Sequence, residues 1–174
     1  MRARIQVRHL LFGLLAALLA APLLLSAAET GFAVILDTSQ SQPRHVEETT
    51  MASVERDYGH AWHAMAAAIE ENKIGLLGSD FVGLAREQLS QAIAEQGKSG
   101  LKRRYIDHGH QVRVVFYSSD GSAMELHDTV RLEIQLLDGD KVVHREQGTF
   151  HFLALMTPAE NSWKVRLLES VSGF

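Results

Sequence analysis

The chain has 174 residues, enough for one domain and a short extra segment. Apolar residues make up 46% and charged residues 22%, a balance typical of globular rather than disordered proteins. The formal net charge is −4. Because the chain has no cysteine, disulfides, thiolate metal sites, a cysteine nucleophile and a lipoprotein cysteine are all excluded.

The first 28 residues have the three parts of an export signal. Three arginines form a positive start without acids, "LLFGLLAALLAAPLLL" is an apolar run, and Ser26 and Ala28 are small residues suited to cleavage. We predict a signal peptide over residues 1–28 and an extracytoplasmic body, either periplasmic or secreted. The alternative is an uncleaved anchor, because residues 10–28 approach the ~20 residues of a membrane-spanning helix and would leave the body outside the cytoplasm.

The predicted body is acidic. Removal of residues 1–28 takes away three arginines, which leaves 14 basic against 21 acidic residues and a net charge of −7. Such a surface is poorly suited to phosphate backbones or anionic lipid. The basic cluster "GLKRRY" has too few charges for a nucleic-acid footprint, and we interpret it as a solvated connection between helix and strand. We expect no nucleic-acid partner, and membrane contact only through an uncleaved N-terminal segment.

Residues 29–42 are interpreted as a linker, whose apolar patch "GFAVIL" fits either the tail of an anchor or an early strand. A long helix is predicted from Pro43, which suits a first helical turn. Its apolar residues recur mostly every three or four positions, which indicates one buried stripe. A second helix is predicted from Ser79, a suitable N-cap, to Gly97 or Gly100. The stripe of the first helix comprises Val54, Tyr58, Ala61, Trp62, Met65 and Ile69.

From Tyr105 onward apolar and polar residues alternate, which predicts strands. Asp-Gly pairs predict tight turns after the first and second strands, and Gly148 suggests a bulge in the third. Each strand has one apolar face that two amphipathic helices can cover. We therefore predict an α+β roll, with two N-terminal helices packed on a curved four-stranded antiparallel sheet. The strands are predicted at about 110–118, 123–137, 142–156 and 162–171.

The order of two helices and long hairpins, closing on "SWKVRLLESV", resembles the nuclear transport factor 2-like superfamily of cone-shaped, cystatin-like α+β rolls. The resemblance covers about residues 44–172, and we assign residues 43–174 to this domain. The superfamily includes ketosteroid isomerase, scytalone dehydratase, limonene epoxide hydrolase and many non-catalytic binding domains. It implies an open cavity between sheet and helices, and it makes a homodimer through the sheet an expectation. Catalytic residues differ between members, so the resemblance assigns none here.

Asp128 interrupts the apolar face of the predicted second strand. The other even positions from 124 to 136 are apolar, so its carboxylate is expected to point at the helices. An ionised carboxylate is costly to bury without partners. Three arrangements would resolve this: a cavity in which Asp128 is a general base or ligand acceptor, a hydrogen bond to Tyr58, Trp62 or a helix histidine, or a bulge that turns Asp128 outward.

His110 extends the inward row of the first strand. A hairpin that keeps both even rows on one face pairs Val114 with Asp128, which puts His110 ~13 Å away at ~3.3 Å per residue. We therefore predict no direct contact, although a ligand spanning both residues stays an alternative. "DHGH" also suggests a metal site through Asp107, His108 and His110, but zinc needs further ligands that the spacing does not supply. We predict no metal.

Inward aromatic residues are candidates for a pocket lining, although they also fill cores. No HExxH, GxSxG or phosphate-binding loop is present. We predict an exported, non-catalytic domain that binds a partner protein or a small apolar ligand in the cell envelope and uses no cofactor. The alternative is a small cavity enzyme, a lyase, isomerase or hydrolase that uses Asp128 for proton transfer. The candidate cavity lining comprises His110, Tyr58, Trp62, Phe150, Phe152 and Trp163.

Overall fold

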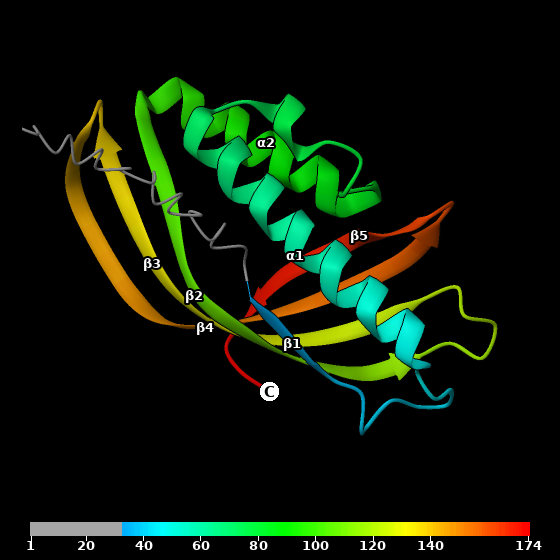
Figure 1. The fold of residues 1–174 in the computed structure, drawn as a ribbon. Helices are drawn as coiled ribbons and strands as arrows, with labels where there is room; N and C mark the ends of the chain where they lie inside the picture. The colour runs from blue at the N-terminus through cyan, green and yellow to red at the C-terminus, as the bar shows by residue number, and fades with distance from the viewer. Residues whose placement is uncertain (1–32) are drawn as a thin grey trace, which may run out of the picture.

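The structure, a computed structural model, describes residues 33–174, and the predicted signal peptide over 1–28 lies outside the described residues. Two helices precede a run of long strands, and Figure 1 shows the sheet curving around the helices. The elements are β1 (Val34–Asp37), α1 (Glu48–Glu71), a 3-10 turn (Ile74–Leu77), α2 (Gly83–Ser99), β2 (Leu101–Tyr117), β3 (Met124–Asp138), β4 (Lys141–Ala159) and β5 (Ser162–Val171).

The predicted α+β roll is confirmed, with five strands in place of four. The strand order is β1-β2-β3-β4-β5, in which β1 runs parallel to β2 and every other pair is antiparallel. The additional strand, β1, lies within residues 29–42, which we had interpreted as a linker. Its side chain Leu36 is buried in the core. The apolar patch therefore contains an early strand, one of the two alternatives left open.

The helices begin later than predicted. Helix α1 starts at Glu48 and not at Pro43, and its predicted stripe is buried as expected. Helix α2 starts at Gly83 and not near Ser79, because residues 80–82 are extended and pair with β5. There Val82 N–H donates to the Val165 carbonyl, and Val165 N–H donates to the Asp80 carbonyl. Gly100 ends α2 in the left-handed conformation, with φ of 72°.

The strands are longer and more irregular than the alternation indicated. Strand β2 begins at Leu101, and its pairing with β3 shifts at a bulge between Asp107 and His110. Gly109, inside this bulge, has φ of 114°, a conformation that favours glycine. Gly148 pairs regularly with Leu132, so the predicted bulge at that position is wrong. Both Asp-Gly turns are present.

The core lies between the helices and the inner face of the sheet. The alternation in β3 is confirmed from Met124 to Leu132, where the even positions are fully buried. Beyond Leu132 it is not, because Gln135 and Leu137 are buried there and Ile134 is only half-buried. Helix α1 packs against β1, β2 and β5, and α2 against β2 and β5. Across residues 33–174, no helix combines the length and apolar character needed to cross a membrane.

Candidate functional site

Asp128 lies on the inner face of β3, where its exposed fraction is 0%. Tyr58 of α1 donates its hydroxyl hydrogen to Asp128 Oδ2 at 2.9 Å, and His110 Nδ1 lies 2.7 Å from the same oxygen. Oδ1 is buried and has no hydrogen-bond partner within residues 33–174. Of the three predicted arrangements for Asp128, the structure therefore has the second, a hydrogen bond to a helix side chain.

The contact between His110 and Asp128 corrects our expectation that the two are too far apart. Asp128 pairs with Val112 and not with Val114, because β2 and β3 are shifted by an irregularity between Val114 and Phe116. His110 then pairs with Val130 and becomes the diagonal neighbour of Asp128 on the same face. Diagonal neighbours across two strands lie within reach of long and aromatic side chains.

A second carboxylate approaches His110 from its own strand. The bulge turns Asp107 onto the inner face, where its Oδ2 lies 3.3 Å from His110 Nε2 and its Oδ1 accepts a hydrogen bond from Gly109 N–H. Burial lowers the pKa of His110, but hydrogen bonds to Asp107 and Asp128 and their charges outweigh it and raise the pKa to about 9. The imidazole is therefore protonated at neutral pH, in a buried row Asp107–His110–Asp128–Tyr58.

Tyr58 completes this row as a neutral donor. Burial raises the pKa of its phenol well above the usual value, and the Asp128 charge raises it further. Around the row, the Trp62 ring centre lies 4.7 Å from that of His110 and 5.1 Å from that of Phe152. The structure thus brings together four predicted lining residues.

The other two predicted lining residues lie elsewhere in the core. Trp163 is buried against Tyr117, with ring centres 6.1 Å apart. Phe150 is half-buried and packs on the edge of the core. Neither residue lines the two cavities described next.

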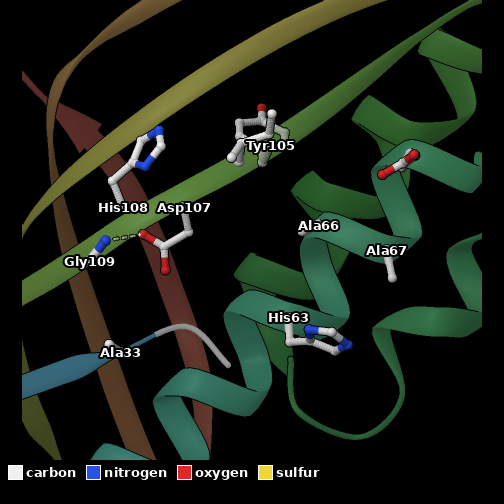
Figure 2. Close-up of a pocket in the computed structure, with 10 residues that line it drawn as sticks. Ala33, His63, Ala66, Ala67, Tyr105, Asp107, His108 and Gly109 are labelled. Atoms are coloured by element: carbon white, nitrogen blue, oxygen red, sulfur yellow. Dashed lines mark hydrogen bonds between the residues drawn. The ribbon is translucent and has the colours of Figure 1, made fainter. Parts of the chain in front are cut away.

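A hollow of about 520 Å³ lies between α1 and the bulge of β2, and we call it the bulge hollow. Figure 2 shows Asp107, His108 and Gly109 of β2 on one side and His63 of α1 on the other. Two of its polar groups are engaged within the protein: Asp107 binds Gly109 and His110, and Glu70 forms an ion pair with Arg104 at 2.7 Å. A ligand there would compete with these contacts.

The three residues of "DHGH" that suggested a metal site do not lie on one face. His108 is exposed whereas His110 is buried in the core, because the bulge separates the faces on which they lie. Over the part of the chain that the structure describes, no group of three or more His, Asp or Glu side chains is arranged to hold a metal ion.

A second space, which we call the inner cavity, lies between α1, α2 and the sheet and measures about 250 Å³. Sequence analysis placed Trp62 and Phe152 in such a cavity, and both line it. Small-molecule sites are commonly ~300–1,000 Å³ and mostly apolar with few polar groups, so the inner cavity resembles a small one. The polar residues that line it are Gln96, Arg103, Tyr105 and Ser170. The large apolar residues that line it include Trp62, Met65, Ile69, Leu89, Phe152 and Leu168.

Sequence reasoning missed two polar residues of the inner side. Asp57 is 7% exposed, and its Oδ2 accepts a hydrogen bond from Trp163 N–H at 2.7 Å. Only its place beside Tyr58 in the apolar stripe hinted at burial. Arg103 was interpreted as part of a solvated connection, but it belongs to β2 and lines the inner cavity. The predicted alternation began only at Tyr105, so no sequence signal placed Arg103 in a strand.

No protein-family model matches the chain, and no curated protein matches it in sequence. Among solved structures, the intermembrane space region of the chloroplast protein ARC6 is similar with a TM-score of 0.62 at 18% identity, over 74% of this chain and 98% of that one. A protein of unknown function with a cystatin-like fold from Nostoc punctiforme has a TM-score of 0.47 at 8% identity, over 73% and 93%. A protein described as a scytalone dehydratase from Novosphingobium aromaticivorans has a TM-score of 0.46 at 10% identity, over 71% and 85%.

At such identities a likeness carries the fold and not the activity. The ARC6 region matches over nearly its whole length, and the element order and the curved sheet agree with the resemblance stated from the sequence. The chain has an α+β roll fold, and it shares this fold with the ARC6 region.

Proposed function

We propose that this chain is an exported, non-catalytic binding domain that holds a small apolar ligand in the inner cavity. The observation that supports it most is the composition of that cavity. Aromatic and aliphatic side chains from α1, α2, β4 and β5 surround a space that the core packing leaves open. Apolar surface that stays unfilled in an otherwise close-packed core forgoes contact energy, which a matching ligand supplies.

The buried charges support binding over chemistry. Tyr58 and His110 both contact Asp128 Oδ2, and Asp107 contacts His110 from the bulge. Asp128 is not among the residues that line the bulge hollow or the inner cavity. A general base must come within hydrogen-bond reach of the proton that it removes. Asp128 is held away from both spaces, so it serves this proposal as a structural group.

The alternative, a cavity enzyme, has one observation in its favour. Asp107 borders the bulge hollow and contacts the protonated His110, which would relay charge between that hollow and Asp128. In such an enzyme Asp107, and not Asp128, would meet the substrate. Because the Asp107 oxygens already bind Gly109 and His110, we place this alternative second.

The proposed location outside the cytoplasm rests on residues 1–28 alone. Their positive start, apolar run and small residues are those of an export signal. Detection of the chain in a periplasmic or culture fraction, with its N-terminus cut near Ala28, is the expected result. Recovery in the cytoplasmic fraction would contradict this part of the proposal.

The cavity proposal is tested with a filling variant and a matched control. Ala92 and Ala94 of α2 are both exposed, but Ala92 lines the rim of the inner cavity and Ala94 does not line it. We expect octan-1-ol to bind the wild-type protein in isothermal titration calorimetry. Ala92→Phe, which places a ring in the cavity, should weaken this binding at least tenfold, whereas Ala94→Phe should leave it unchanged. Equal loss in both variants, or no binding by the wild type, would refute the proposal.

A further inference from the structure

The inner cavity has one charged residue in its wall. Arg103 lies on the inner row of β2 with Tyr105, and both line the cavity. Arg103 is also exposed, so the cavity meets solvent at this residue. Its neighbours in "GLKRRY" differ: Arg104 is paired with Glu70, and Lys102 is exposed and does not line the cavity. One cation of the basic cluster is thus placed at the mouth of an apolar space.

The charge of Arg103 is not neutralised by the described part of the protein. Within residues 33–174 no carboxylate lies within ion-pair distance of it. Tyr105 is its neighbour on the inner row of β2, and burial raises the pKa of that phenol while the Arg103 charge lowers it again in part. A guanidinium has five N–H donors in a planar fork, so Arg103 can offer a pair of donors to an acceptor.

We propose that the ligand of the inner cavity is a small apolar monocarboxylate, whose tail fills the aromatic and aliphatic wall and whose carboxylate is bound by Arg103. This inference rests on the proposed function and specifies its ligand class. The planar fork of arginine matches a carboxylate through two parallel hydrogen bonds.

The size of the cavity and the charge of the whole chain set further limits on the ligand. A space of about 250 Å³ excludes long lipid chains and leaves room for a short acyl or aryl acid. The predicted body is acidic, so the overall field repels anions and gives no general attraction. Binding of an acid therefore depends on this single arginine, which makes its removal informative.

The test compares octanoate with octan-1-ol, which share an apolar chain and differ in the charged group. At neutral pH the wild type is expected to bind octanoate at least tenfold more tightly than octan-1-ol in isothermal titration calorimetry. Arg103→Gln should remove this preference, so that the variant binds octanoate no more tightly than it binds octan-1-ol. Lys102→Gln removes the same charge one residue away, and it should retain the wild-type preference.

A charge reversal gives an independent measurement. Arg103→Glu is expected to bind octylammonium at least tenfold more tightly than octanoate, because the carboxylate at the mouth then selects a cation. Far-UV circular dichroism of each variant checks that the fold is retained.

The outcomes separate the two proposals. If the wild type binds octan-1-ol and octanoate equally, the carboxylate inference is wrong and the apolar binding function stands. If neither probe binds, both are wrong. If Arg103→Gln and Lys102→Gln weaken octanoate equally, the preference comes from general charge and the role of Arg103 is refuted.

Discussion

Replacement of Asp128 by leucine tests whether the buried carboxylate holds the core together. The variant takes away the acceptor of the Tyr58 hydroxyl and one of the two carboxylates that contact His110. Both remaining groups are buried, so solvent cannot replace the lost partner. Breaking a buried ion pair from one side typically costs ~3–5 kcal/mol. Asp107 still contacts His110 in this variant, but the Tyr58 hydroxyl is left without its acceptor.

This loss is large compared with the total free energy of unfolding of a domain. Domains are commonly stable by roughly 5–15 kcal/mol, so Asp128→Leu is expected to remove about a fifth or more of the free energy of unfolding. Urea unfolding at neutral pH, followed by circular dichroism, measures the change as a lower midpoint at constant slope. For a chain of this size the melting temperature should fall by about 6–20 °C, at ~2–4 °C per kcal/mol.

Two control variants separate the loss of the buried contact from the general effect of replacing a carboxylate. Asp138→Leu changes an exposed carboxylate on the same strand and should shift stability by less than ~0.5 kcal/mol. The triple variant Tyr58→Phe, His110→Leu, Asp128→Leu replaces the linked groups together and should regain most of the lost stability, since removal of both partners of a buried contact is nearly neutral. An unchanged midpoint for Asp128→Leu would refute the reasoning.

Three further predictions concern other groups. The pKa of His110 is about 9 in the folded chain against 6.5 unfolded, so its contribution to stability is complete below pH 6.5 and is lost as the pH rises through 9; the free energy of unfolding from urea melts should fall by ~3 kcal/mol across this range in the wild type and by less in Asp128→Leu. Asp57→Ala leaves the buried N–H of Trp163 without its acceptor and should cost ~1–3 kcal/mol in the same assay. Gly121→Ala places a side chain at φ of 76° in the turn before β3, and should lower the free energy of unfolding by ~1–2 kcal/mol.

The fold could be predicted from the sequence because apolar residues recur clearly at the helical spacing in one part of the chain and at the strand spacing in another. The apolar stripe of α1 and the alternation of β3 each state which side chains are buried, and both were confirmed, the alternation as far as Leu132. The early strand β1 was harder, because four residues without a long alternation fit a strand or an anchor equally well. It is held by parallel pairing with β2, a contact between segments more than 70 positions apart that no local pattern contains.

The contacts of Asp128 could not be predicted from the sequence, because they depend on the pairing register between β2 and β3. Alternation gave its face correctly, but the partner of each residue is decided by irregularities near Val114 and Asp107. Neither irregularity has a strong sequence signal, although Gly109 marks one of them. A shift of two positions moved His110 from an expected ~13 Å to direct contact. Pairwise geometry across strands is thus less predictable than burial.

The inner face of the sheet carries charged groups that are paired within the protein and one, Arg103, that is not paired with a carboxylate of residues 33–174. This difference is the reason for placing function at Arg103 and not at Asp128. A buried charge that contacts an opposite charge is already stabilised, and any ligand would have to displace that partner. His110 is in this state, between Asp107 and Asp128. Arg103 borders an apolar space without a carboxylate nearby in residues 33–174, so an incoming anion gains the interaction without breaking another. A cavity that offers an uncompensated charge and an unfilled apolar wall together selects ligands that carry both features.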